Sequence, residues 1–515
     1  MIRHTVTIMP VGQTFEYPEG TPILEILEDH GYSTPAPCGG KEVCGKCLVK
    51  AQGGLSPKSD AEAALAPDPS MRLACSALIA GDAVIYPVRK RSGCRMDRHE
   101  VNAGSEFCMA FDIGTTSIQA SLVDRISARR YDICSFLNPQ RRFGHDVISR
   151  IAACADEKAA AAMTSLLRQE LSDVHREITS RFNIRPGAVR EIVFSGNTTM
   201  IYLLIGLDVR GLGAFPYRAS LLDFDPATVR KAVPGSHEKT VVRALPAASA
   251  FLGGDLVGGL AFLHHLGHDR SVFFIDIGTN GEMFLRDGEG GIYAASCAMG
   301  PALEGMNIEC GMTADSGAVD HVCVTDGHVR FSVIDNAQPA GISGTGIVDL
   351  IAIMIRAGIV APDGSFSPPG TAPVPNGISV DHGAKKIVLA PNVFVSQKDI
   401  RNVQLAKGAS LAAAEMLLDE AKITADRIEN VFIAGAFGEH LDLDNFAQLK
   451  FLPGFSSARW HFLGNTSLRA AEEYGMSQDF RALTARLRDS IKVVDLHDTF
   501  NDRFLRSLDF SPAQK

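Results

Sequence analysis

A short motif of Asp, Ile, Gly and Thr occurs twice in this 515-residue chain and constrains its fold more than any other feature. The first copy covers residues 111–117 (Phe-Asp-Ile-Gly-Thr-Thr-Ser), and the second covers 275–281 (Ile-Asp-Ile-Gly-Thr-Asn-Gly). In each copy an apolar, strand-like run delivers an aspartate near its end, breaks at Gly-Thr and returns as another strand-like run. Each copy therefore predicts a β-hairpin, and the repeat predicts a duplicated unit.

The residue types in this motif suit phosphate and metal binding. Glycine in a turn lets backbone N–H groups approach an anion, and Thr or Ser hydroxyls add hydrogen-bond donors. The aspartates Asp112 and Asp276 could hold Mg²⁺ through its water ligands. The candidate phosphate-binding residues are Gly114, Thr115, Thr116, Gly278, Thr279 and Asn280. Two such hairpins facing each other would clamp the phosphates and metal of a nucleotide between two halves.

Strand-like and helical runs alternate from residue 107 to the end, which predicts an α/β architecture. The strand-like runs include 191–195, 241–245, 272–277, 329–334, 386–389 and 430–434. The helical runs include 156–181, 255–266, 344–359 and 399–418. Several strands end in a Gly-containing turn, as at 195–199, 341–346 and 434–439, although a single turn of this kind is weak evidence for an anion site. The Walker A and GxGxxG patterns are absent, so neither rival nucleotide site finds support.

With these motifs the chain resembles the superfamily of actin, sugar kinases and Hsp70. The resemblance implies an α/β actin-like (ribonuclease H-like) ATPase with two duplicated halves that binds ATP and Mg²⁺. Asp112 and its Gly-Thr-Thr turn match the first phosphate motif, and Asp276 with Gly278, Thr279 and Asn280 matches the second. Less specifically, the adenosine motif is matched by Gly435, Ala436, Phe437 and Gly438. The alternative for each half-motif alone is a purely structural hairpin.

The N-terminal stretch carries a group of cysteines in a glycine-rich loop. Residues 4–9 and 13–17 predict a short hairpin, and 22–30 predict a helix with Pro22 in its first turn. Cys38, Cys44 and Cys47 then follow closely, and Cys75 lies further along the chain. Three close thiolates and one distant thiolate can ligate the two irons of a 2Fe–2S cluster.

This stretch resembles plant-type ferredoxin, which implies an α+β β-grasp domain over residues 1–90. It departs from that pattern because Cys38 and Cys44 are separated by five residues instead of four. A structural zinc site and unligated thiols remain as alternatives, but only one Cys-x-x-Cys pair is present. Cys94 is near enough in sequence to compete with Cys75 as fourth ligand, and the other cysteines are expected to be buried or inert.

Residues 89–106 contain almost no apolar side chain and predict a linker, so we expect domains at 1–90 and 107–515 with a linker at 91–106. The net charge of −9 argues against nucleic acid as the main partner. The N-terminus lacks the apolar core of a signal peptide, and the most apolar later run, 344–360, contains Asp349 and Arg356. We therefore expect a cytoplasmic protein without a membrane partner.

The combination of a ferredoxin-type domain with this ATPase is similar to the reductive activators of corrinoid proteins, which serve cobalamin-dependent methyltransferases. Further stretches resemble that family, namely 138–150, 300–305, 398–401, 406–409 and 463–466. The resemblance implies ATP-dependent, one-electron reduction of Co(II) to Co(I) in a corrinoid protein. It further implies a low-potential electron donor upstream, while a homodimer is left open. Glu304 and Glu439 are candidates to orient the attacking water, although a solvated loop carboxylate is the simpler interpretation of each.

Two other functions stay open at the level of sequence. One is a redox-regulated kinase of a small molecule, which would release ADP only with an added metabolite and without a corrinoid partner. The other is a nonenzymatic ferredoxin module on a nucleotide-binding scaffold, which would not hydrolyse ATP even with a corrinoid protein present.

Overall fold

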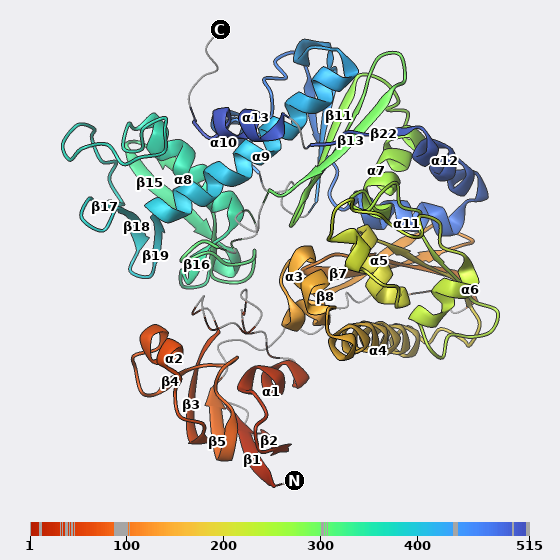
Figure 1. The fold of residues 1–515 in the computed structure, drawn as a ribbon, viewed down its shortest axis with the longest axis horizontal. Coiled ribbons are helices and arrows are strands. Elements are labelled where there is room, and N and C mark those ends of the chain that lie inside the picture. Colours follow the sequence, from red (N-terminus) through yellow and green to blue (C-terminus); the bar gives the residue numbers. More distant parts are fainter. Residues whose placement is uncertain are drawn as a thin grey trace.

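The computed structural model shows two regions, one up to residue 86 and the other from residue 101 (Figure 1). The described residues are 2–9, 13–30, 32, 34, 36, 40, 42, 45, 47–86, 101, 104–299, 303, 305, 307–435, 441–496 and 499–510. The predicted linker at 91–106 lies largely outside them and stays a prediction. Its last residues are anchored on the second region, because the buried Ser105 hydroxyl donates to Asp124 at 2.7 Å.

The N-terminal region is a five-stranded mixed sheet with a helix packed on it, as a β-grasp domain requires. The sheet order is β2-β1-β5-β3-β4, with β1 and β2 antiparallel and β1 and β5 parallel. Its elements are β1 (Arg3–Ile8), β2 (Gln13–Pro18), α1 (Ile23–Asp29), β3 (Leu48–Leu55), α2 (Asp60–Leu65), β4 (Met71–Leu73) and β5 (Ile79–Tyr86). Ile26 and Leu27 of α1 are fully buried with Val6, Val49 and Ile85 of the strands, so one apolar helix face forms the core. The predicted hairpin and helix are confirmed.

The second region begins with a five-stranded sheet of order β10-β9-β6-β7-β8. The strands are β6 (Phe107–Ile113), β7 (Ser117–Asp124), β8 (Arg130–Leu137), β9 (Val189–Ser195) and β10 (Val241–Ala244). The helical segments are η1 (Pro139–Phe143), α3 (Val147–Ala153), α4 (Glu157–Arg181), α5 (Thr198–Ile205), η2 (Arg210–Leu212), α6 (Pro226–Val229), η3 (Arg230–Ala232) and α7 (Gly254–His265). The β6 strand is buried along nearly its whole length, which explains its unbroken apolar sequence.

A second sheet follows with the order β21-β20-β11-β12-β13-β22. Its strands are β11 (Val272–Ile277), β12 (Gly281–Arg286), β13 (Ile292–Cys297), β20 (Asn430–Ala434), β21 (Arg459–Phe462) and β22 (Ile491–Val493). Two small sheets are inserted, formed by β14 (Ala318–Thr325), β15 (His328–Val333) and β16 (Gly341–Ile342), and by β17 (Ser379–Asp381), β18 (Lys386–Ala390) and β19 (Val393–Ser396). The helical segments are η4 (Ile334–Asn336), α8 (Gly344–Arg356), α9 (Gln397–Ala421), η5 (Ala425–Arg427), α10 (Leu443–Leu449), α11 (Thr466–Met476), α12 (Gln478–Asp489) and α13 (Phe500–Arg506).

The two large sheets have the same topology. When the strands of each sheet are counted in chain order, the first five run third-second-first-fourth-fifth in both, and the second sheet adds β22 beside its third strand, β13. In both sheets the first three strands are antiparallel and the fourth is parallel to the first. The pairing is equivalent as well: Asp112 lies between Gln119 and Ser195, and Asp276 lies between Glu282 and Ala434. The duplicated ribonuclease H-like fold predicted from the repeated motif is therefore confirmed.

The helices α7 and α11 pack between the two halves (Figure 1). One buried cluster joins Cys108 and Val193 of the first sheet to Phe274 and Phe432 of the second, with Leu468 of α11 among them. Near the end of the chain, α11 contacts β6 and β9. A helix of the second half therefore packs on the strand of the first half that carries Asp112.

Two further predictions can be compared with the structure. No helix in the part of the chain that the structure describes is long and apolar enough to cross a membrane. Cys134 in β8 is buried, as expected for the cysteines outside the cluster set, and it is disulfide-bonded.

Candidate nucleotide cleft and cluster site

The two predicted phosphate-binding turns meet across the molecule. We call residues 114–117 the first turn and residues 278–281 the second turn. The hydroxyl oxygens of Thr116 and Thr279 are 3.4 Å apart, although 163 positions separate them in the chain. This contact places the Gly-Thr segments of both halves at one cleft, as the repeated motif predicts.

Hydrogen bonds from neighbouring segments hold the first turn in place. Gly114 cannot be replaced without a shift, because a Cβ there would lie 2.4 Å from the carbonyl oxygen of Ser117. The side-chain amide of Asn197, which caps α5, donates to the Thr115 hydroxyl at 3.2 Å. In the second turn the Gly278 N–H donates to the Asn280 carbonyl at 3.0 Å, which closes a tight loop.

Asp112 lies at the end of β6 and is held by α11. The Asn465 side-chain amide and the Ser467 hydroxyl each donate to its carboxylate at 2.7 Å. Burial raises the pKa of the Asp112 carboxyl, whereas the hydrogen bonds from Ser467 and Asn465 act in the opposite direction. Asn465 also donates to Gln119 on β7 at 3.1 Å, so the Asp112 side chain is oriented from two elements.

Three further carboxyl groups surround this position. Burial together with the charges of Asp255 and Asp112 raises the pKa of Asp276 to about 8. Burial and Asp112 raise the pKa of Asp255, near the start of α7, to about 7. Burial, Asp255 and Asp276 raise the pKa of Glu282 on β12 well above its ordinary value. Carboxyl groups that oppose each other's ionisation in this way favour a bound cation.

The carboxyl groups do not form a direct metal cage. No group of three or more His, Cys, Asp or Glu side chains among the described residues has the arrangement of a metal site.

The predicted adenosine motif is described only at its first residue. Gly435 has a φ of +90°, and its N–H donates to the Gly464 carbonyl at 3.0 Å. A Cβ at Gly435 would lie 2.6 Å from the Ile277 carbonyl oxygen and 2.8 Å from an Asp276 carboxylate oxygen. Glycine is therefore required beside the second aspartate. Ala436, Phe437 and Gly438, as well as Glu304 and Glu439, lie outside the described residues.

Two of the four predicted cluster ligands come together in the N-terminal domain. The sulfur atoms of Cys47 and Cys75 are 3.3 Å apart across 28 positions of sequence, and Cys47 is buried. The pairing fits a shared 2Fe–2S cluster and supports Cys75 as the distant ligand. Cys38, Cys44 and the competing Cys94 lie outside the described residues.

A buried ion pair supports the Cys75 position. The Arg72 guanidinium donates to the Glu62 carboxylate at 2.8 and 3.1 Å, and both side chains are almost completely buried. The same carboxylate accepts the Leu73 N–H at 2.8 Å, so the strand leading to Cys75 is tied to α2.

Several residues at the cleft have only weak signals in the sequence, or none. Asp255 follows two glycines at the start of a helical run, and Glu282 directly follows the second turn, so both had weak local signals. Asn465 was noticed only within the stretch 463–466, and Ser467 not at all. Their roles depend on α11 returning to β6, which no local pattern encodes.

Comparisons with known proteins match this organisation. The chain matches family models for the 2Fe-2S iron-sulfur cluster binding domain at residues 6–80, the RACo middle region at 107–265, and the C-terminal ASKHA domain of RACo at 270–515. A solved structure of a reductive activator for corrinoid, iron-sulfur protein covers 98% of both chains with a TM-score of 0.68 at 23% identity, which shows the same fold.

Two curated relatives are also similar. The corrinoid activation enzyme RamQ of Eubacterium limosum is 32% identical over 386 residues, which is 72% of this chain and 64% of the relative. The Co(II) methylated amine-specific corrinoid protein reductase of Methanosarcina barkeri is 23% identical over 78% of this chain and 76% of the relative. The matched part thus spans less than two thirds of the first relative. With its 2Fe–2S, RACo middle and RACo C-terminal ASKHA regions in order, the chain belongs to the RACo family.

Proposed function

We propose that this chain reduces the Co(II) form of a corrinoid protein to Co(I) by ATP-dependent transfer of one electron. The observation that carries the proposal is that one chain combines a cysteine pair on a β-grasp domain with two Gly-Thr turns facing each other in an actin-like cleft. One relative is named as a corrinoid activation enzyme and the other as a reductase of a Co(II) corrinoid protein. The partner is therefore proposed to be the corrinoid protein of a methyltransferase system.

An energetic argument explains why ATP is needed. Co(I) is so strong a reductant that an ordinary 2Fe–2S centre transfers an electron to Co(II) against the potential difference. Each 100 mV of such a difference costs about 2.3 kcal/mol for one electron. ATP binding and hydrolysis can offset this cost only if the nucleotide distinguishes two conformations of the complex. We propose that these two conformations differ in how the two halves close around the cleft.

Each part of the chain has a proposed role in this scheme. When bound, the cluster supplies one-electron redox chemistry, and Cys38, Cys44, Cys47 and Cys75 are its proposed ligands. The first and second turns are proposed to bind the ATP phosphates, and the segment 435–438 the adenosine. Asp112 and Asp276 are proposed to hold Mg²⁺ or to position the attacking water. The cytoplasm, with a low-potential electron donor upstream, remains the expected setting.

Asp255 is the side chain best suited to accept a proton from the attacking water. Its pKa of about 7 is close to neutral pH, where a carboxylate is an effective general base. It lies near Asp112 and Asp276 at the same cleft, as their mutual influence on ionisation indicates.

The decisive experiment mixes the reduced protein with a Co(II) corrinoid protein and records the Co(I) absorption spectrum with and without MgATP. The proposal predicts Co(I) formation that depends on MgATP. Co(I) formation of equal extent without nucleotide would contradict it, and so would its absence in the presence of MgATP.

A further inference from the structure

One short segment, residues 138–150, donates hydrogen bonds to the first turn. The acceptors are the first three carbonyl groups of that turn. The Asn138 backbone N–H donates to the Thr116 carbonyl at 3.0 Å, and the Asn138 side-chain amide donates to the Gly114 carbonyl at 2.9 Å. The Arg150 guanidinium donates to the carbonyl between them, that of Thr115. The backbone orientation of the first turn therefore depends on this segment.

Arg150 is fully buried and links the first turn to the middle of the segment. Its Nε donates to the Gly144 carbonyl at 2.8 Å, and its Nη1 lies 3.1 Å from the Met200 sulfur. A buried cation is stable only while its hydrogen bonds are kept, so the Arg150 geometry resists independent movement of either end. Gly144 is the residue directly before His145.

The same segment reaches the N-terminal domain through His145. The imidazole is 94% buried and hydrogen-bonded to the backbone of Ala36, which lies two residues before Cys38. Burial and the nearby Arg141 lower the pKa of His145 to about 4. The ring is thus neutral at physiological pH, and its contact with Ala36 needs no charge.

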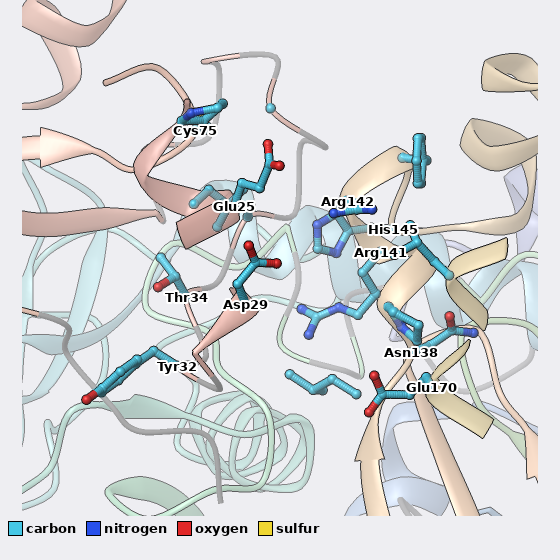
Figure 2. A pocket seen from close by; sticks show the side chains of 18 residues that line it. Glu25, Asp29, Tyr32, Thr34, Cys75, Asn138, Arg141, Arg142, His145 and Glu170 are labelled. Carbon is cyan, nitrogen blue, oxygen red and sulfur yellow. The ribbon is translucent and has the colours of Figure 1, made fainter. Parts of the chain in front are cut away.

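A cavity of about 710 Å³ lies beside this contact and is lined by residues of both domains. Figure 2 shows Arg141 and His145 on one side of the cavity and Glu25 and Asp29 of α1 on the other. The lining includes Cys75, a proposed cluster ligand. The acidic side chains of Glu25 and Asp29 therefore face the basic side chain of Arg141 across this cavity.

We infer that residues 138–150 form a coupling element, in which Asn138 and Arg150 position the first turn and His145 holds the backbone at Ala36, two residues before Cys38. A shift of the first turn on nucleotide binding would then be transmitted through Arg150 and Gly144 to His145. By thermodynamic linkage, a nucleotide that favours one position of the N-terminal domain binds more tightly when the domain is in that position. This inference rests on the proposed function, because it assumes that ATP binds at the two turns.

The test uses the visible circular dichroism of the oxidised cluster, which reports the surroundings of its ligands. The full-length protein is titrated with Mg²⁺ and a nonhydrolysable ATP analogue, and binding is followed in parallel by calorimetry. We expect the analogue to change the spectrum of the wild-type protein. The change should be lost in His145→Ala at saturating analogue, while binding persists.

Matched variants separate coupling from general damage. Ile148→Ala alters an exposed side chain of the same segment and should keep the wild-type response. Arg150→Lys keeps the charge at the end remote from the cluster but cannot make all three contacts, so it should weaken analogue binding by roughly fivefold and reduce the spectral change. Arg168→Lys, which alters an arginine bonded to the Leu204 carbonyl, should do neither.

The possible outcomes distinguish this inference from the proposed function. A full spectral response in His145→Ala, or none in a wild-type protein that binds the analogue, would overturn the coupling role and leave the ATPase proposal standing. Failure of the wild-type protein to bind the analogue at all would overturn the proposed function and the coupling with it.

Discussion

The hydroxyl groups of Thr116 and Thr279 lie 3.4 Å apart, and they belong to equivalent turns of two halves that share one topology. Because each hydroxyl follows an aspartate-bearing strand, the contact brings Asp112 and Asp276 to the same cleft. In this arrangement the charge of Asp112 contributes to the raised pKa of Asp276. A nucleotide with its divalent cation would bind between the two turns, and the Thr116 and Thr279 hydroxyl groups would then contact the ligand in place of each other.

Mg²⁺ binding in the presence of nucleotide is expected to strengthen as the pH rises from 6 to 8. The pKa values of Asp255 and Asp276 are raised to about 7 and about 8, so both hold protons that a cation must displace. Each displaced proton makes the affinity roughly tenfold higher per pH unit below the pKa. Calorimetric Mg²⁺ titrations at pH 6, 7 and 8 measure this slope. Equal affinities at pH 6 and pH 8 would contradict the raised pKa values.

Asp276→Asn is expected to stabilise the nucleotide-free protein at alkaline pH. The pKa of Asp276 is higher in the folded protein than in the unfolded chain, so its protonation favours folding. This contribution is present below about pH 4 and is lost as the pH rises towards 8. The melting temperature of Asp276→Asn relative to wild type should therefore increase between pH 6 and pH 8. A constant difference across that range would be inconsistent with this explanation.

Glu62→Gln is expected to release the cluster at a lower denaturant concentration. The substitution leaves the buried Arg72 without its carboxylate, and breaking one partner of a buried ion pair costs roughly 3–5 kcal/mol. Glu62 also accepts the Leu73 N–H, so the strand before Cys75 loses a tether. Loss of visible absorption in a urea titration measures the effect. Glu16→Gln, which alters the exposed pair with Arg3, should leave the midpoint almost unchanged.

Cys75→Ser is expected to abolish the visible absorption of the cluster and to lower the iron content. The 3.3 Å separation of the Cys47 and Cys75 sulfur atoms is the reason for choosing Cys75 over Cys94 as fourth ligand. Cys94→Ser and Cys154→Ser are the matched comparisons and should retain a full complement of iron. An intact spectrum in Cys75→Ser together with its loss in Cys94→Ser would reverse the assignment.

The sequence predicted the parts of this fold whose signals are local. The apolar run 272–277 predicted β11 with its observed limits, and the apolar run that carries Asp112 predicted β6, because buried strands need continuous apolar residues. The repetition of the motif also predicted the duplication, since equivalent hairpins imply equivalent sheets. The helical period of residues 22–30 is also a local signal, and it was sufficient to locate α1.

The rest of the cleft depends on distant segments and could not be predicted from local patterns. Asn465 and Ser467 bind Asp112 from positions more than 350 residues away, because α11 packs on β6. Arg150 has no sequence signal for burial, since an arginine is usually exposed. The carboxyl group of Asp255 becomes a candidate base only through its neighbours, which tertiary structure supplies.

The central claim is that nucleotide at the two turns drives the electron transfer, and Asp276→Asn tests it most directly. The variant is mixed, after reduction, with a Co(II) corrinoid protein and MgATP, and Co(I) formation is recorded with the cluster absorption. We predict that Co(I) formation is lost while the cluster spectrum remains that of the wild type. Wild-type Co(I) formation by a variant with an intact cluster would contradict the account.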